Sequence, residues 1–166
     1  AKRMIYRWEW PIAFYLDEVY AYDSYGNRTS TTVFNSEGDY STLSSANPRT
    51  STATYDSFYH TYLLSQTSPL VGQPPTTFTY GDYSLGLPET MTGPNGLDTT
   101  VTVKYDPFGR PLKIIRPGDS EISPTIQFTY VTYTTTPTLQ PFHIQMSQKM
   151  EDGAYANFVR YYNGLG

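Results

Sequence analysis

Histidines are the side chains best suited to acid–base or metal chemistry near neutral pH, and this chain has only two, His60 and His143. A structural metal site needs three or four converging ligands. His60 lies in a hydroxyl-rich stretch, whereas His143 alternates with Phe142 and Ile144 and so belongs to the opposite strand face. We therefore expect both histidines to be structural or surface residues and expect no metal site.

Carboxylates are more numerous, but their placement favours a structural role. Asp23, Asp56 and Asp106 recur where turns are predicted, and Asp at such a position accepts backbone hydrogen bonds. A glycosidase needs two carboxylates across a cleft, and the repeated turn already explains these three. Three further acidic pairs could hold calcium, but none has the ordered spacing of a calcium loop. They are Asp17 with Glu18, Asp119 with Glu121, and Glu151 with Asp152.

Motifs for covalent or cofactor chemistry are absent from the sequence. There is no Gly-x-Ser-x-Gly nucleophile elbow, no Gly-x-Gly-x-x-Gly and no phosphate-binding loop, and the glycines within 81–86 have the wrong spacing. The chain has no cysteine, which excludes disulfides and thiolate ligands. We therefore predict that the chain is not an enzyme and binds no cofactor.

The composition favours a β-rich chain without a nucleic-acid or membrane partner. Its formal net charge of −4 gives no electrostatic attraction to nucleic acid. No stretch approaches the roughly 18 apolar residues of a membrane span. Charged residues are only 16% of the chain, whereas 17 tyrosines and many threonines suit a pleated, half-buried surface. One sequon, Asn27-Arg28-Thr29, is weak evidence for glycosylation.

A tyrosine repeat organises the sequence. Residues 22–26 and 105–109 share the pattern Tyr-Asp-x-aromatic-Gly, residues 55–59 form a degenerate copy, and residues 161–166 form a looser one. Tyr80 and Tyr130 close two further strands, so that tyrosines recur in three equal steps of 25 residues from position 55 to 130. Each unit of about 25 residues would supply two strands and two turns, and neighbours must stack to bury a face.

The repeated motif has a mechanical interpretation as a hairpin turn. In residues 106–109, Asp, Pro and Gly occupy first, second and fourth positions of a type I turn, and a left-handed glycine adds the bulge that continues the hairpin. Residues 23–26 fit the same turn. The copy at Asp56 has Tyr59 where glycine is required, so we expect a different turn there.

Strands with period-two alternation lie between these turns. Val101, Val103 and Tyr105 would share one strand face. The same alternation appears in Ile126, Phe128 and Tyr130, and in Phe142, Ile144 and Met146, with further turn signals at Glu37-Gly38, 93–96 and 117–119. The predicted fold is all-β: consecutive antiparallel β-hairpins forming a curved continuous sheet over residues 17–166. Residues 1–16 are predicted to be an irregular N-terminal segment, with a strand pair or a helical turn as alternatives within residues 6–22.

At these residues the chain resembles the RHS or YD-repeat proteins. The likeness rests on residues 22–27, 105–110 and 162–166, with a similar spacer at 86–96, and covers about 17–166. It implies a strip of β-hairpins that spirals into a hollow shell, as in bacterial polymorphic toxins, toxin-complex cocoons, wall-associated proteins and teneurins; carbohydrate binding is also attached to the repeat.

The chain departs from the toxin members of this family in one respect. Their shell-closing region carries paired Asp-Pro-x-Gly motifs for self-cleavage, whereas residues 106–109 are the only such motif here and fit an ordinary turn. We therefore carry over no catalytic residue. Trp8 and Trp10 lie outside the repeat and are candidates for a local binding surface.

The repeat tyrosines are expected to form a packed ladder between hairpins, with a sugar-stacking platform as the alternative. The residues to which we assign turn or ladder roles are Tyr22, Asp23, Gly26, Tyr55, Asp56, Tyr80, Tyr105, Asp106, Gly109, Tyr130, Tyr161 and Gly164.

The sequence therefore predicts a non-catalytic structural module from a secreted or bacterial surface shell. We expect the chain to be a fragment of a longer protein. Its expected partners are neighbouring repeats or identical copies, in an oligomer or filament formed through sheet edges. The alternative is a carbohydrate-binding or adhesion module with glycan partners.

Overall fold

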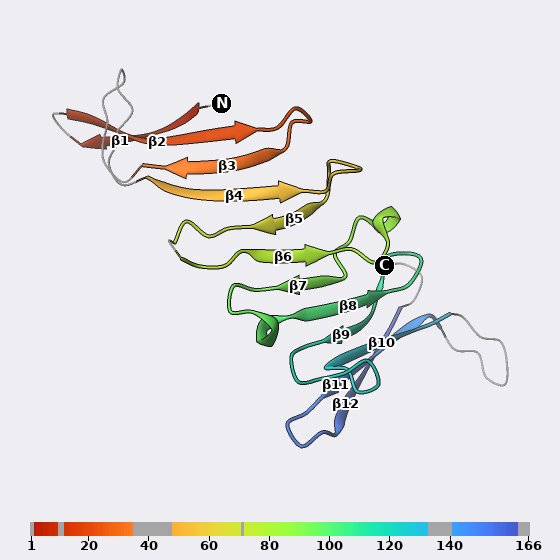
Figure 1. The fold of residues 1–166 in the computed structure, drawn as a ribbon. Helices are drawn as coiled ribbons and strands as arrows, with labels where there is room; N and C mark the ends of the chain where they lie inside the picture. Colours follow the sequence, from red (N-terminus) through yellow and green to blue (C-terminus); the bar gives the residue numbers. More distant parts are fainter. Residues whose placement is uncertain (1, 10–11, 35–47, 71, 133–140, 163–166) are drawn as a thin grey trace. The chain divides into compact units, whose positions relative to one another are not determined.

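The computed structural model describes residues 2–9, 12–34, 48–70, 72–132 and 141–162, with side chains from residue 18 onward. Within these ranges the chain forms twelve β-strands and two single-turn 3-10 helices, and it divides into two compact units, residues 1–78 and 79–166 (Figure 1). The prediction of an all-β fold is confirmed.

The first unit contains six strands, except for Thr79, the last residue of the sixth strand, at which the second unit begins. They are β1 (Lys2–Glu9), β2 (Ile12–Tyr22), β3 (Arg28–Val33), β4 (Arg49–Tyr55), β5 (Leu63–Gln66) and β6 (Thr76–Thr79). Each strand from β1 to β5 pairs antiparallel with the strand that follows it in the chain. This arrangement confirms consecutive antiparallel hairpins in this unit.

The second unit repeats the same order. It contains the helices η1 (Tyr83–Leu85) and η2 (Leu97–Thr99) and the strands β7 (Thr90–Thr92), β8 (Val101–Tyr105), β9 (Pro111–Ile115), β10 (Ile126–Val131), β11 (His143–Lys149) and β12 (Tyr155–Tyr161). Each strand from β7 to β11 again pairs antiparallel with the next one.

The irregular N-terminal segment predicted for residues 1–16 is wrong, and the strand pair named as an alternative for this region is the one that forms. β1 pairs with β2 over eight residue pairs, from Lys2 with Val19 to Glu9 with Ile12, so a boundary after residue 16 would fall inside β2. The helical turn considered for this region is also not formed, because residues 18–22 continue β2 and pair with β3. Aromatic and β-branched residues favour strand there, and strands on both sides satisfy the backbone of β2.

The predicted glycine turns are confirmed. Gly26 and Gly109 have φ angles of 89° and 77°, in the left-handed region. Their amides donate to the Asp23 and Asp106 carbonyls at 3.3 and 2.9 Å. The strand pairing next to each turn contains a register shift, as a β-bulge produces. The turn signals at 93–96 and 117–119 also form turns, closed by amides of Gly96 and of residue 119. Glu37-Gly38 lies outside the described residues.

The turn after Asp56 differs, as its sequence indicates. The left-handed residue is His60, with φ 55°, rather than Tyr59. The Asp56 amide bonds the Tyr62 carbonyl at 2.9 Å, six residues on, whereas the Asp106 amide bonds the Arg110 carbonyl four residues on. The longer turn avoids a left-handed tyrosine.

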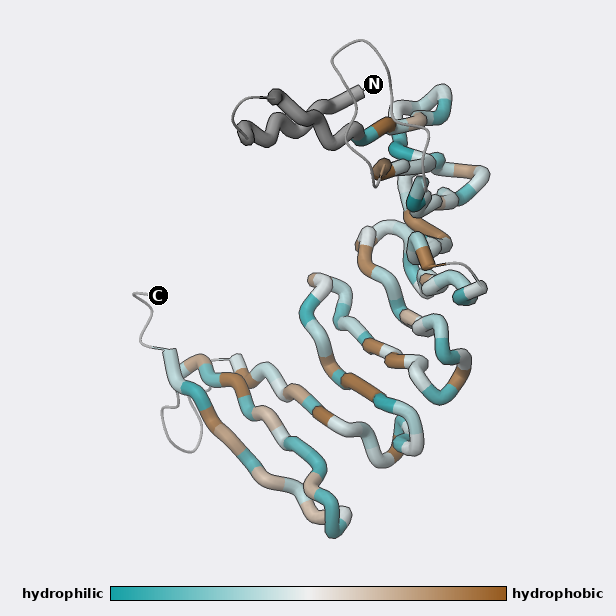
Figure 2. Tube along the Cα trace, turned by 90° about the vertical axis from the view of Figure 1, so that its left-hand side faces the viewer, coloured by the Kyte–Doolittle hydropathy of each residue, from teal (hydrophilic) through white to brown (hydrophobic). Residues whose placement is uncertain are grey.

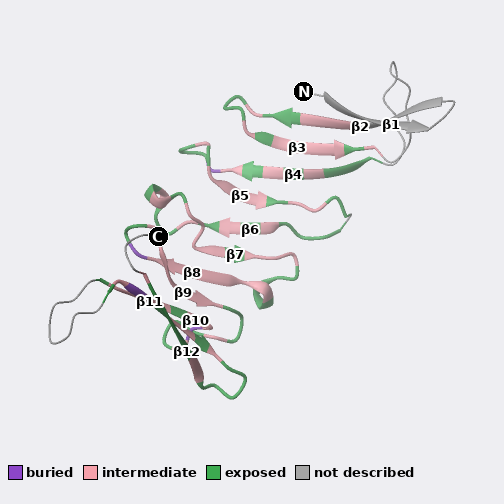
Figure 3. Ribbon diagram, turned by 180° about the vertical axis from the view of Figure 1, so that it is seen from behind, coloured by how far each residue is buried: buried purple, intermediate pink, exposed green. Residues whose placement is uncertain are grey.

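No aliphatic or aromatic hydrophobic side chain is buried among the residues whose burial is described; most strand residues are half-buried (Figure 3). The buried side chains are instead those of Asp56, Asp106, Pro124 and His143. In β8 and β9 every residue is half-buried, so the predicted alternation of sequence produces no alternation of burial. A single layer leaves both of its faces partly open to solvent, which explains this pattern.

Candidate functional site

Asp56 accepts more backbone amides than any other carboxylate among the described residues. It follows β4 and is 6% exposed. Its two oxygens accept four backbone amides, those of Phe58 (3.1 Å), Tyr59 (2.5 Å), Thr61 (3.0 Å) and Tyr62 (2.9 Å). The carboxylate thus accepts the backbone donors of the long turn. Asp56 is therefore the internal cap of its turn.

Asp106 and Asp23 cap the shorter turns in the same way. Asp106 accepts the amides of Phe108 and Arg110, both at 2.9 Å, and the Arg110 side-chain Nε–H at 2.6 Å. Asp23 accepts the amides of the residues two and four positions on, at 2.9 and 2.8 Å, together with the Asn27 side-chain amide at 2.9 Å. The aspartates of the repeat thus have a local structural explanation.

The environment keeps these carboxylates ionised. Burial alone raises the pKa of the Asp56 carboxyl, but its four amide donors together lower that pKa well below its ordinary value. The pKa of Asp106 is also lowered, because the amide and guanidinium of Arg110 outweigh the effect of burial. A carboxylate held anionic by such bonds is poorly suited to donate a proton near neutral pH.

We expect stability to be lost in acid. Because the folded pKa of each capping aspartate lies below its unfolded value of 3.8, the stabilisation is fully present above the unfolded pKa and is lost as pH falls toward the folded pKa. The Tm should stay nearly constant between about pH 7 and pH 5 and fall below about pH 4. The Asp56→Asn protein should show a shallower acid decline in thermal melts, and an identical decline in both proteins would contradict this account.

Three of the repeat tyrosines donate their hydroxyl to a backbone carbonyl at, or just before, the start of an earlier strand. The Tyr55 hydroxyl donates to the Arg28 carbonyl at 3.4 Å, Tyr105 to that of residue 88 at 3.2 Å, and Tyr130 to that of Pro111 at 3.0 Å. Arg28 and Pro111 begin the strands adjacent to β4 and β10. Burial raises the pKa of the Tyr105 and Tyr130 hydroxyls, which keeps them protonated as donors.

The other predicted ladder positions are placed differently. Tyr22 is 49% exposed at the end of β2. The Tyr80 ring stacks on that of Tyr83, with centroids 5.4 Å apart, and the Tyr161 ring lies 5.0 Å from that of His143. Gly164, Trp10 and the side chain of Trp8 lie outside the described residues. The tyrosines at 55, 105 and 130 therefore share a hydrogen bond from the hydroxyl to a backbone carbonyl, which neither Tyr22 nor Tyr161 forms to a described residue.

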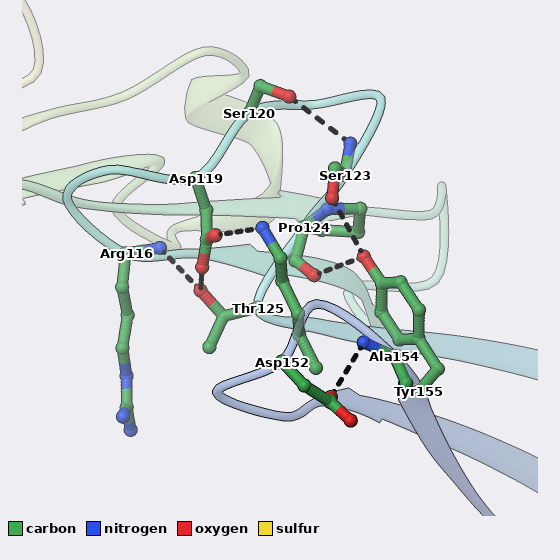
Figure 4. Close-up of polar contacts among 10 residues, drawn as sticks. Arg116, Asp119, Ser120, Ser123, Pro124, Thr125, Asp152, Ala154 and Tyr155 are labelled. Atoms are coloured by element: carbon green, nitrogen blue, oxygen red, sulfur yellow. Dashed lines mark hydrogen bonds and ion pairs between the residues drawn. The ribbon is translucent and has the colours of Figure 1, made fainter.

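Tyr155 makes the same kind of hydroxyl-to-carbonyl hydrogen bond, and the sequence interpretation missed it. It follows Tyr130 by the same 25 residues as the earlier steps, and this spacing could have revealed it. Its hydroxyl donates to the carbonyl of the fully buried Pro124 at 2.8 Å and lies 3.3 Å from the Ser123 hydroxyl (Figure 4). It thereby holds the loop before β10 against β12.

Replacing Tyr155 by phenylalanine should lower the free energy of unfolding by about 1 kcal/mol, because the Pro124 carbonyl loses its donor. Tyr161→Phe is the matched control, since Tyr161 is 62% exposed and its hydroxyl has no hydrogen bond to a described residue. Urea unfolding compares the two variants. Equal stabilities would show that the hydrogen bond from Tyr155 to Pro124 contributes nothing to the free energy of unfolding.

A second connection in the same region joins Asp119 to β11. The Lys149 ammonium donates to one Asp119 oxygen at 2.6 Å, and the Thr125 hydroxyl donates to the other at 2.5 Å (Figure 4). These hydrogen bonds lower the pKa of Asp119 and raise that of Lys149. A carboxylate committed to a cation is a poor calcium ligand, and no cluster of three potential metal ligands occurs in the described parts of the chain.

Polar side chains also connect successive turns. The Arg110 guanidinium bonds Asp106 and lies over the Tyr130 ring, 4.3 Å from its centroid. In the first unit, the Asn27 side-chain amide donates both to Asp23 and to the His60 carbonyl, at 2.9 and 2.6 Å. Both hydrogens of Asn27 are therefore used within the fold, and a glycan on this nitrogen would displace one of these bonds.

The histidines and the turn aromatics have separate environments. His143 is 2% exposed. Its Nδ1 lies 3.1 Å from the Pro141 carbonyl oxygen, and its Nε2 lies 3.2 Å from the side-chain amide nitrogen of Gln145. His60 stacks face to face on Tyr25, with ring centroids 3.7 Å apart. The aromatic ring at the tip of each repeat turn is exposed: 63% for Tyr25, 80% for Phe58 and 83% for Phe108.

Comparisons with protein-family models, curated proteins and solved structures found no match for this chain. Within the described ranges, no helix is long and apolar enough to cross a membrane.

Proposed function

We propose that this chain is a non-catalytic structural array, a segment of an RHS-type β-hairpin shell or scaffold that is secreted or displayed on a bacterial surface. The observation that carries the proposal is a recurring connection: an aspartate caps the turn, and a tyrosine hydroxyl bonds a backbone carbonyl in or just before an earlier strand. Asp56 with Tyr55 and Asp106 with Tyr105 supply both parts of it. Such nearest-neighbour connections are what an array of stacked repeats requires.

One face of the second unit supports a role in assembly. Strand register places Ile114 opposite Ile126, and Phe128 opposite Met146, which in turn faces Phe158. We call this set, with Val103 and Ile144, the apolar face. The adjacent positions on the opposite face are Lys113, Gln127, Ser147 and Asn157, and hydrophobic and hydrophilic residues alternate along these strands (Figure 2).

The apolar face is only partly covered in this chain. A groove of about 390 Å³ lies over Phe128, Met146 and Phe158, and Phe158 is 52% exposed. Exposed apolar patches of this kind mark interaction surfaces. In the proposed function, neighbouring repeats or identical copies cover it, and pairing along the outer edge of β12 extends the sheet.

Truncation tests the array. A chain ending after residue 132 lacks β11 and β12 but keeps every connection around Asp56 and Asp106. Because stability in an array is a sum of repeats and their interfaces, it should melt at a lower temperature and retain its strand signal by circular dichroism. Complete loss of strand signal would indicate one indivisible domain and would overturn the proposal.

Carbohydrate binding is the second candidate function, favoured by the exposed turn aromatics Tyr25, Phe58 and Phe108. Exposed aromatic rings can stack on sugar rings, and the surrounding hydroxyl groups supply hydrogen bonds. A glycan array tests this candidate: binding that disappears in the Phe58→Ser protein supports it, and an array without signal removes it.

A further inference from the structure

A small polar pocket lies on one face of the sheet formed by β3, β4 and β5. Its volume is about 240 Å³. Ala53 lines it from the middle of β4, opposite Gln66, and Ser51 lines it opposite Thr31. Since alanine has the smallest side chain on this part of β4, we infer that Ala53 leaves the space that its larger neighbours surround.

Arg28 gives the pocket its only formal charge. It begins β3 and lines the pocket, and its guanidinium lies over the Tyr20 ring, 5.4 Å from the centroid. Within the described part of the chain it forms no ion pair with a carboxylate. Stacking on an aromatic ring leaves the in-plane N–H donors of arginine available to a ligand.

Among the other polar side chains of the pocket, the Thr52 and Tyr55 hydroxyls are bonded, to Thr67 and to the Arg28 carbonyl. The side chains of Thr31, Ser51 and Gln66 form no hydrogen bond to any described residue. On the opposite face of the same strands the hydroxyls are paired instead: Thr32 with Thr50, and Thr52, which also borders the pocket, with Thr67, each at 2.8 Å. Free donors and acceptors are thus concentrated on the side of Arg28.

We propose that this pocket binds a hexuronic acid, a sugar ring that carries a carboxylate. A planar carboxylate matches the paired donors of a guanidinium, and no carboxylate among the lining residues competes for Arg28. The hydroxyls of Thr31 and Ser51 and the amide of Gln66 both donate and accept, as the hydroxyls of a sugar ring require. The volume is below that of drug-sized sites and suits a single ring.

A site for phosphate would be built differently. Phosphate sites typically use several cations or a set of converging backbone amides, whereas this pocket offers one guanidinium and neutral side chains. Tyr55 lines the pocket and its hydroxyl bonds the Arg28 carbonyl, but the Arg28 side chain, which would recognise the carboxylate, takes part neither in the repeat connections nor in the turn aromatics. Failure of the pocket and failure of the proposed functions are therefore distinguishable.

Titration with D-glucuronate, followed by NMR or calorimetry, tests the proposal. We expect saturable, millimolar-range binding to the wild-type chain, with glucose and acetate each at least about tenfold weaker because each lacks half of the recognised groups. Arg28→Gln should weaken glucuronate binding by about tenfold or more. Ala53→Leu, which keeps the cation and fills the space, should also abolish binding.

Arg116→Gln is the matched control, since Arg116 is exposed and does not line the pocket. Circular dichroism establishes that each variant is folded, and Arg28→Gln remains decisive if Ala53→Leu does not fold, because Arg28 is exposed. Absence of glucuronate binding, or equal binding by Arg28→Gln, overturns the proposal. Acetate or glucose binding as tight as glucuronate overturns the assignment of a hexuronic acid.

Discussion

Replacing Asp56 by alanine is expected to lower the Tm by about 10 °C or more, the largest stability effect of any single side chain discussed above. The carboxylate accepts four backbone amides and is 6% exposed. Truncation removes the carboxylate acceptor of all four amides. Buried donors left unsatisfied cost more than the bonds contribute on average. Differential scanning calorimetry of the purified variant measures the effect.

Asp152→Ala is the matched control for this substitution. Asp152 is exposed and accepts one amide, that of Ala154 at 3.0 Å, so its removal should change the Tm by no more than about 2 °C. Asp56→Asn, which keeps the shape and one oxygen acceptor, should fall between the two. If Asp56→Ala and Asp152→Ala melted at the same temperature, the capping role of Asp56 would be refuted.

Phe158→Lys should weaken self-association of the chain by at least about tenfold. Phe158 lies on the apolar face and is 52% exposed, so the substitution leaves the chain's own fold nearly unchanged while placing a charge where a partner would pack. Burying an unpaired ammonium in an apolar contact is unfavourable. Light scattering coupled to size-exclusion chromatography compares the variant with the wild type.

Asn157→Lys separates two routes of association. Asn157 is the preceding residue of β12, points to the opposite face, and accepts a hydrogen bond from Ser147 at 2.7 Å. If association depends on the apolar face, this variant should assemble nearly as well as wild type. Equal inhibition by both lysines would instead assign association to the edge of β12, where lysine discourages strand pairing on either face.

Local chemistry explains which features could be predicted from the sequence. The left-handed glycines at 26 and 109, and the different turn at Asp56, follow from residues within six positions of one another. The same holds for the capping carboxylates. The 25-residue tyrosine spacing indicates the repeat and points beyond Tyr130 to Tyr155, whereas the sequence interpretation placed the next copy at residues 161–166, where a looser version of the motif stands.

Contacts between distant residues could not be derived in this way. Lys149 and Asp119 are 30 residues apart, and neither belongs to a repeated motif. The same applies to the register of β1 and β2: a strand pair was one alternative for this region, but residues 2–21 lack the repeat that would have fixed how the two strands pair. Period-two alternation predicts which residues share a face, but not whether another layer covers that face. The strands are therefore half-buried on both faces, although the sequence led us to expect one covered face.

Sedimentation velocity of the wild-type chain across a wide concentration range at neutral pH tests the central proposal most directly. A structural array with an uncovered apolar face and an open strand edge should show a sedimentation coefficient that rises with concentration, as copies cover one another. A single species of 18.8 kDa at every concentration would contradict the proposed role in assembly.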